Sequence, residues 1–180
     1  MALPRPSTAH PRAVATQASA LRMQRYRRWI RNVQPRQSEA LCCMLAHRID
    51  GELAHCSPMP PAYMAFFVEV LSDPSLFGRT GAWNFPQVLG RRRHALTLTD
   101  FKRLGNCVVD NYVRYLDEDL CLALCDLIAR CFHLEHAAAL LARLKLLEAG
   151  KPPSLQGIAD DGLRIFWSRR SGGIPAASRS

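Results

Sequence analysis

Cysteine and histidine are the side chains of this sequence that could most directly bind a metal or act in catalysis. Cys43 and His47 lie four residues apart, and so do Cys121 and Cys125. Zinc binds both thiolate and imidazole. However, the Cys-x-x-Cys pairs of many structural zinc sites are missing, and these cysteines lie among leucines, where cysteine acts as a small hydrophobe. We therefore predict that the chain holds no metal and no cofactor.

Known catalytic motifs are also missing from the sequence. It has no Gly-x-Ser-x-Gly turn, and the segment 78–81 (Gly-Arg-Thr-Gly) lacks the lysine and hydroxyl of a phosphate-binding loop. The segment 133–136 (His-Leu-Glu-His) does not have the two histidines four apart that zinc proteases use. We therefore predict no catalytic residues and a protein that is not an enzyme. A thiol within hydrogen-bonding reach of a histidine in an open cleft would change that interpretation.

The irregular segment 78–98 is the preferred candidate for a binding surface, since long loops inside compact domains are often functional. At 78–94 it combines aromatic and basic residues, and tryptophan and arginine often dominate the energetics of interfaces. The predicted partner-binding residues are Trp83, Phe85, Arg91, Arg92 and Arg93. Our first hypothesis is a non-catalytic module that binds another protein, as an adaptor or an inhibitor of the immunity or antitoxin type. In the alternative, Trp83 and Phe85 fill the core and the arginines are solvated.

Residues 21–33 provide a second candidate surface. Their aromatic and aliphatic residues fit one face of a helix, whereas arginines occupy the other faces. The candidates for binding a nucleic acid or another anionic surface are Arg22, Arg25, Tyr26, Arg27, Arg28, Trp29 and Arg31. Arginines could contact phosphates while aromatic rings stack on bases, or the segment could lie on an acidic membrane surface. A helix at the edge of the domain, with its aromatic rings packed inward, is the remaining alternative.

The net charge of +9 is distributed unevenly along the chain. Residues 1–37 contribute +8 and residues 164–180 contribute +4, whereas residues 38–163 contribute −3. A folded nucleic-acid binder usually has one basic face, which this pattern does not indicate. Binding of nucleic acid through the N-terminal arm is therefore our second hypothesis.

The cysteine content and the hydropathy indicate the cellular setting. Seven cysteines, an odd number that includes an adjacent pair, favour a reducing compartment and a cytoplasmic location. No window has the roughly 18 uncharged apolar residues of a membrane-spanning helix.

Apolar residues spaced three and four apart predict an all-α fold, either an antiparallel helical bundle or a short HEAT-like stack of about five helices. The predicted helical segments are 38–53, 61–71, 100–116, 118–132 and 133–149, with short turns at 75–77 and 86–89. Thr99 and Asp117 are predicted N-caps. The helix after Asp117 is apolar nearly all round, which predicts a central position. Gly105 indicates either close packing against a neighbour or a later helix start.

The predicted domain organisation has four parts. Residues 1–37 form a basic, largely disordered arm with a possible helix at 21–33. Residues 38–150 form the helical domain, 151–170 an extension packed on that domain, and 171–180 a flexible tail. Within the extension, Asp-Gly between two apolar runs predicts a small hairpin over 155–167, with a short helix as the alternative. Residues 1–20 lack a periodic pattern and have the acid-free composition of a transit peptide, although a true start at Met23 is an alternative explanation.

Overall fold

The computed structural model describes residues 11–171, and every regular element among them is helical, which confirms the all-α prediction. The α-helices are α1 (Pro11–Asn32), α2 (Pro35–Glu52), α3 (Pro61–Ser72), α4 (Pro74–Phe77), α5 (Asn84–Arg91), α6 (Leu98–Asn111), α7 (Glu118–Cys131), α8 (Leu134–Leu147) and α9 (Ile158–Ser171). The short 3-10 helices are η1 (Arg93–Ala95), η2 (Tyr112–Arg114), η3 (Glu148–Gly150) and η4 (Pro153–Leu155). The described part of the chain therefore has more helices than the five or so predicted.

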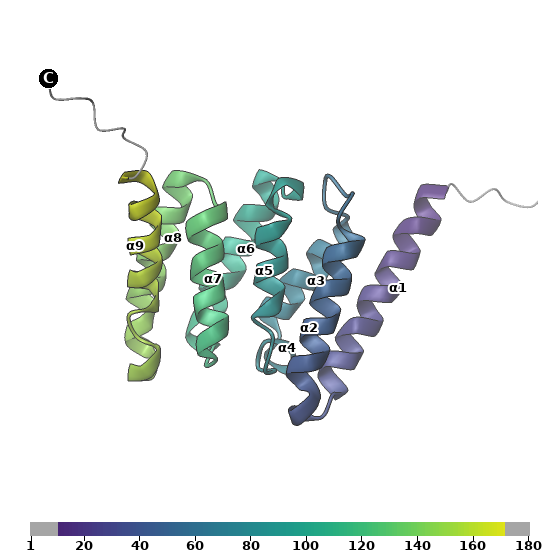
Figure 1. The fold of residues 1–180 in the computed structure, drawn as a ribbon, viewed down its shortest axis with the longest axis horizontal. Coiled ribbons are helices and arrows are strands. Elements are labelled where there is room, and N and C mark those ends of the chain that lie inside the picture. The colour runs from purple at the N-terminus through teal and green to yellow at the C-terminus, as the bar shows by residue number, and fades with distance from the viewer. Residues whose placement is uncertain (1–10, 172–180) are drawn as a thin grey trace, which may run out of the picture.

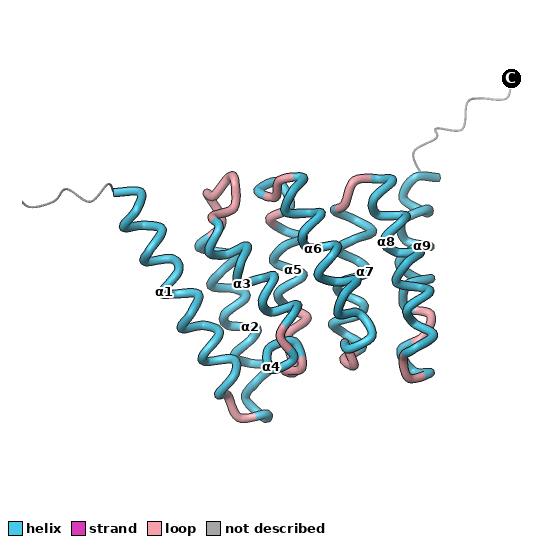
Figure 2. Tube along the Cα trace, turned by 180° about the vertical axis from the view of Figure 1, so that it is seen from behind, coloured by secondary structure: helices cyan, strands magenta, loops and turns pink. Residues whose placement is uncertain are grey.

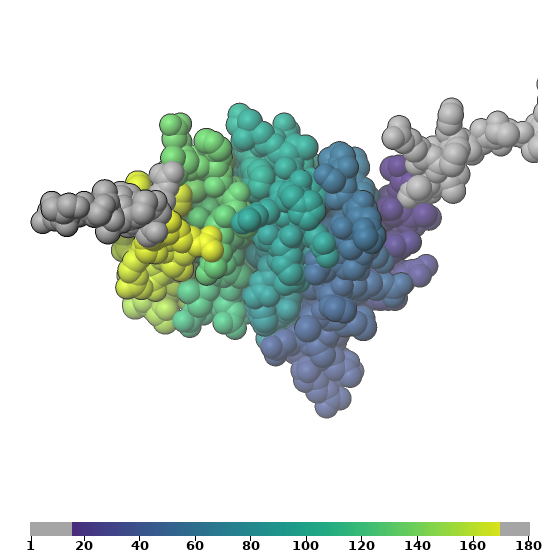
Figure 3. All heavy atoms as spheres, turned by 45° about the horizontal axis from the view of Figure 1, so that its top comes forward, coloured from purple at the N-terminus to yellow at the C-terminus, as the bar shows by residue number. Residues whose placement is uncertain are grey.

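The helices form two rows along the long axis of the molecule (Figures 1 and 2). One row consists of α1, α3, α6 and α8, and the other consists of α2, α5, α7 and α9. Because the chain passes from one row to the other at each step, consecutive helices form antiparallel pairs, with α4 as a short turn after α3. In the space-filling view the pairs follow one another in sequence order along the axis (Figure 3).

Three of the four helices of the first row begin at nearly equal intervals, which the sequence does not reveal as a repeat. α3, α6 and α8 begin at Pro61, Leu98 and Leu134. Their buried positions hold different residue types, for example Phe66 in α3 and Leu140 in α8. The regularity therefore lies in the spacing of the helix starts along the chain, and the residue types at buried positions do not repeat.

Local capping residues set where several helices begin. The Asp117 carboxylate accepts a hydrogen bond from the Leu120 backbone N–H at 2.8 Å, which confirms the predicted cap of α7. The cap of α6 is Thr97, and the prediction of Thr99 is wrong. Thr97 forms a reciprocal capping box with Asp100, because Asp100 lies three residues later and can accept from the Thr97 backbone N–H.

α7 lies between α5 and α9 in the second row. It packs against α5, α8 and α9, and seven of its residues are buried. The helices α6 and α8 approach each other closely at Gly105 of α6, where a Cβ atom would lie 2.9 Å from Leu140 Cδ1. Gly105 therefore reflects close packing and not a later start of α6.

The possible helix predicted at 21–33 of the N-terminal arm is present, and it is part of α1, so the prediction of disorder is wrong for residues 11–20. Met23, Tyr26 and Ile30 are buried, and they join the hydrophobic core through the contacts of α1 with α3 and α2. These residues recur at intervals of three and four, so they bury a continuous stripe of the helix. Residues 1–10 of the predicted arm lie outside the described residues.

The predicted hairpin over 155–167 is also wrong, and its helical alternative is correct. The segment contains the last residue of η4 and most of α9, which begins at Ile158. The carboxylate of Glu148 accepts hydrogen bonds from the backbone N–H groups of Gly157 and Ala159, at 2.9 and 2.7 Å. A residue distant in sequence thus satisfies the unpaired donors at the beginning of this helix.

The docking of α9 depends on a close approach to α7. A Cβ atom at Gly162 would lie 3.1 Å from Cys125 Cβ, so a small residue is needed where the two helices meet. Apart from Ser171, the predicted tail at 171–180 lies outside the described residues. Between Pro11 and Ser171, no helix combines the length and apolar character that a membrane-spanning segment requires.

Candidate functional site

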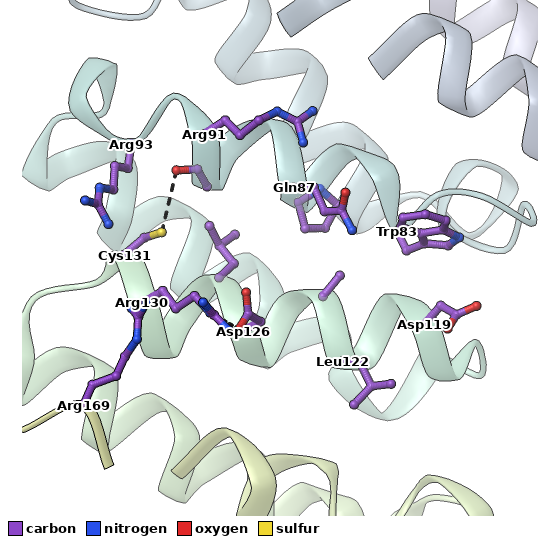
Figure 4. A pocket seen from close by; sticks show the side chains of 14 residues that line it. Trp83, Gln87, Arg91, Arg93, Asp119, Leu122, Asp126, Arg130, Cys131 and Arg169 are labelled. Atoms are coloured by element: carbon purple, nitrogen blue, oxygen red, sulfur yellow. Dashed lines mark hydrogen bonds and ion pairs between the residues drawn. The ribbon is translucent and has the colours of Figure 1, made fainter. Parts of the chain in front are cut away.

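A groove opens on the second row of helices, between α5 and α7, and reaches the end of α9 (Figure 4). Its volume of about 660 Å³ falls within the range of ligand-binding pockets. Its lining combines aromatic, aliphatic, basic and acidic side chains. The residues that line the groove include Trp83, Gly90, Arg91, Arg93, Asp119, Leu122, Asp126, Arg130, Cys131 and Arg169.

One face of α7 forms the floor of the groove. Asp119, Leu122, Asp126 and Arg130 are spaced three or four residues apart, so they share a face of the helix. At a rise of about 1.5 Å per residue, this face extends roughly 16 Å from Asp119 to Arg130. The Leu122 side chain is 41% exposed, although seven residues of α7 are buried. An apolar side chain is thus open to solvent on the floor, one turn from Asp119.

The position of Trp83 at one end of the groove depends on the turn before α5. Gly81 has a φ angle of 91°, and a Cβ atom there would lie 2.7 Å from the Cα atom of Glu39 in α2. Only glycine suits both this conformation and this approach. The same turn is bound to α2 by Ser38, whose buried hydroxyl donates to the carbonyl of Thr80 at 3.0 Å. The chain then enters α5 with Trp83 half-buried at the groove edge.

The predicted loop at 78–94 is largely helical, since α5 covers 84–91, and its candidate residues do not share one surface. Phe85 is buried and packs edge-on against Phe66, with ring centroids 5.4 Å apart. This matches the alternative interpretation, in which the ring fills the core. Arg92 turns toward α2, where its Nε lies 2.6 Å from Asp50 Oδ1. Trp83, Arg91 and Arg93 are the predicted residues that line the groove.

The arginines of the groove differ in whether a carboxylate neutralises them. Arg91 forms an ion pair with Asp50 at 3.0 Å, and Arg130 pairs with Asp126 one turn earlier in α7. For Arg93 and Arg169, no ion pair is found within residues 11–171. Both of these side chains are exposed. The end of the groove near η1 and α9 thus carries positive charge that no described carboxylate balances.

Cys131 lies at this positive end of the groove, beside Arg93 and Arg130 in Figure 4. Its thiol faces the carbonyl of Gly90, with Sγ 3.9 Å from the oxygen. Burial raises the pKa of the Cys131 thiol and outweighs the opposing effects of Arg93 and Arg169. The thiol is therefore protonated at neutral pH, which disfavours attack on a substrate.

Other chemistry-bearing residues show no further assembled site. In the described ranges, no hydrogen bond joins a cysteine to a histidine, and no cluster of three or more His, Cys, Asp or Glu has the arrangement of a metal site. Burial raises the pKa of the Cys42 and Cys107 thiols to about 11. These side chains serve as core residues, in agreement with their apolar sequence context.

Most of the candidate residues of α1 contact the rest of the protein. Tyr26 is buried and donates a hydrogen bond to Glu52 at 3.1 Å, and Arg22 pairs with the same carboxylate at 3.0 Å. Arg27 forms an ion pair with Glu69, and Arg31 pairs with Glu69 at 2.9 Å and also with an acid of the α3–α4 turn. These contacts bind α1 to α2 and α3.

Three candidates on α1 face outward. Arg25 and Arg28 are exposed and take part in none of the ion pairs found within the described stretch, while Trp29 is 40% exposed. Together with Leu41 of α2, they line a shallow surface depression. This is the part of the predicted basic surface that remains accessible.

The sequence pattern predicts neither the floor of the groove nor its far end. It predicts only a helix at Leu122, Asp126 and Arg130, and only a packed extension at Arg169. The spacing of Asp119, Leu122, Asp126 and Arg130 is visible in the sequence, but nothing there shows which face of a nearly apolar helix is open. Comparisons of the chain with protein-family models, with curated proteins and with solved structures find no match.

Proposed function

We propose that this chain is a non-catalytic protein-binding module, an adaptor or an inhibitor of the immunity or antitoxin type. In this proposal the groove between α5 and α7 binds a segment of a partner protein. The observation that carries it is the composition of the groove, which combines half-buried Trp83, exposed Leu122 and exposed arginines. Tryptophan and arginine are enriched among the residues that dominate binding energy, and apolar centres with charged rims are typical of interfaces.

The arrangement of the helices supports the same proposal. Its antiparallel pairs follow one another as in a short HEAT-like stack, and such stacks present extended surfaces that bind other proteins. We further propose a cytoplasmic location, which is supported by the free state of all seven cysteines.

A matched pair of tryptophan variants tests the groove. Tagged wild-type chain should recover a partner from cells, and Trp83→Ala should lose it while the thermal unfolding curve stays cooperative. Trp29→Ala is the control, because it removes a partly exposed tryptophan from α1 outside the groove. Equal recovery of the same partner by wild type and Trp83→Ala would remove the groove from the proposal.

Binding of a nucleic acid by α1 is a second candidate function. It is supported by Arg25, Arg28 and Trp29, which offer two guanidinium groups and an aromatic ring on one exposed surface. Arginines contact phosphates, and exposed aromatic rings stack on bases. The exposed charge is small, because Arg22, Arg27 and Arg31 are paired with carboxylates.

The double variant Arg25→Glu, Arg28→Glu tests this second function. Wild type should bind a labelled single-stranded RNA with an affinity that falls as salt rises, and the variant should lose that binding. The double variant Arg93→Glu, Arg169→Glu provides the matched control, since it reverses the same number of charges in the groove. Equal loss in both double variants would indicate a nonspecific effect of net charge.

A further inference from the structure

The two ends of the groove differ in charge. Arg93, Arg130 and Cys131 lie at one end, and Trp83 and Asp119 lie at the other, as Figure 4 shows. Arg169 of α9 also reaches the first end. The groove is thus basic where α5, α7 and α9 meet, mixed in the middle, where Gln87 and Asp126 also line it, and acidic at the beginning of α7, one turn from exposed Leu122.

The charge at the basic end is available for a ligand. Arg91 and Arg130 already pair with Asp50 and Asp126, whereas Arg93 and Arg169 have no carboxylate partner in the part of the chain that the structure describes. Their guanidinium groups come from different helical segments and lie near the same thiol, that of Cys131. A carboxylate placed between them could accept hydrogen bonds from both, and such charge-assisted bonds are stronger than neutral ones.

The dimensions of the groove limit the length of its occupant. The face of α7 that forms the floor is roughly 16 Å long, which an extended chain at about 3.3 Å per residue covers with about five residues. From the Arg130 end, this path reaches exposed Leu122 after about 12 Å and ends beside half-buried Trp83. An apolar side chain toward the far end of the occupant would cover Leu122 and remove its surface from water.

We infer that the groove binds a short extended segment of a protein, about five residues long, with carboxylates at one end and an apolar residue about three or four positions away. The carboxylates lie against Arg93 and Arg169, and the apolar residue lies against Leu122 and Trp83. This inference rests on the proposed function and adds to it the chemistry and the direction of the partner segment.

Selection from a random heptapeptide library tests the inference. The full chain is the bait, and peptides that also bind the Trp83→Ala, Leu122→Asp variant are removed. The enriched peptides should place Asp or Glu about three or four residues from an apolar residue. Groove-dependent peptides without acidic residues would overturn the acidic segment but leave the groove as a binding surface. Enrichment of no groove-dependent peptide would overturn the inference and the proposed function together.

Synthetic peptides then measure the contribution of charge. A labelled peptide Asp-Asp-Leu-Leu-Ala should bind more tightly than Lys-Lys-Leu-Leu-Ala in a fluorescence anisotropy titration. The double variant Arg93→Ala, Arg169→Ala should weaken binding of the acidic peptide by roughly tenfold or more. Arg103→Ala, Arg143→Ala is the matched control, because both arginines are exposed and lie outside the groove, and it should leave binding unchanged. Equal affinity for the two peptides, or equal loss in both double variants, would overturn the acidic segment.

Discussion

The first and last helices of the described chain are docked by different kinds of polar contact. α1 is bound by ion pairs of Arg22, Arg27 and Arg31, whose side chains are between 21% and 41% exposed. α9 is bound by Glu148, which is only 4% exposed and accepts hydrogen bonds from the backbone at the beginning of α9. The same carboxylate also accepts from the Tyr112 hydroxyl at 2.8 Å.

This difference concerns how much each contact stabilises the fold. Exposed ion pairs contribute little because water and salt screen them, whereas a buried carboxylate that loses its partners is costly. α1 also depends on Met23, Tyr26 and Ile30 for its burial. We therefore expect the ion pairs of α1 to position a helix that apolar contacts already hold, and Glu148 to be essential for the docking of α9.

The largest expected effect comes from Glu148→Gln. One accepting oxygen is replaced by an NH2 group that can only donate, so the variant places a donor against the backbone N–H of Gly157 or Ala159. We expect a loss of about 3 kcal/mol in the free energy of unfolding, measured by urea denaturation. Hydrogen exchange should quicken most in α9. A loss below about 1 kcal/mol would mean that the two ends are docked alike.

A smaller effect is expected from Glu52→Gln at the other end. Glu52 accepts hydrogen bonds from Tyr26 and Tyr63 and pairs with Arg22, but its side chain is 17% exposed. We expect a loss of about 1.5 kcal/mol in the free energy of unfolding. In 0.5 M salt the difference from wild type should shrink for this variant and persist for Glu148→Gln. A salt-independent loss as large as that of Glu148→Gln would contradict the comparison.

Alkaline pH tests how much buried thiols contribute to stability near each end of the described chain. Burial raises the pKa of the Cys125 thiol to about 12, and that of Cys42 to about 11, from 9.0. Below pH 9 both folded and unfolded chains keep these protons, so the stability is fully present. Above pH 9 the unfolded chain ionises first, and each thiol should cost about 1.4 kcal/mol per pH unit until its folded pKa is reached.

The variant Cys125→Ala separates the contribution of this thiol from that of other ionising groups. Urea denaturation of the variant and of wild type at pH 8, 9 and 10 measures the difference. This variant should lose stability more slowly with pH than wild type, because it lacks one ionising group. Cys42→Ala should do the same at the α2 end of the stack. Parallel pH dependences for all three proteins would show that the decline comes from other groups.

The smallest effect on stability is expected from Arg93→Ala, Arg169→Ala. Both side chains are exposed and have no carboxylate partner within the described part of the chain, so the free energy of unfolding should change by less than about 0.5 kcal/mol. Thermal unfolding by circular dichroism measures this. A clearly destabilised variant would mean that these arginines serve the fold, as those of α1 do.

The sequence by itself determined the local features of this protein. The spacing of apolar residues predicts the helices near 61–71, 100–116 and 118–132, and Asp117 predicts where α7 begins. These predictions are correct because helix periodicity and capping depend on residues within one or two turns of each other. The aromatic and basic residues of the segment around Trp83 and Arg93 also predict a binding surface, and this segment forms one side of the groove.

Only the tertiary structure decided how the ends fold and which charges remain accessible. The 158–167 segment is helical because Glu148 caps it and Gly162 fits against α7, and neither contact is visible as a local pattern. Arginines on α1 and in the groove look equivalent in the sequence, yet carboxylates from other helices neutralise most of the first set and leave Arg93 and Arg169 unpaired within the described chain. The physical reason is that an ion pair needs two groups within about 4 Å, a distance that the packing of the helices sets.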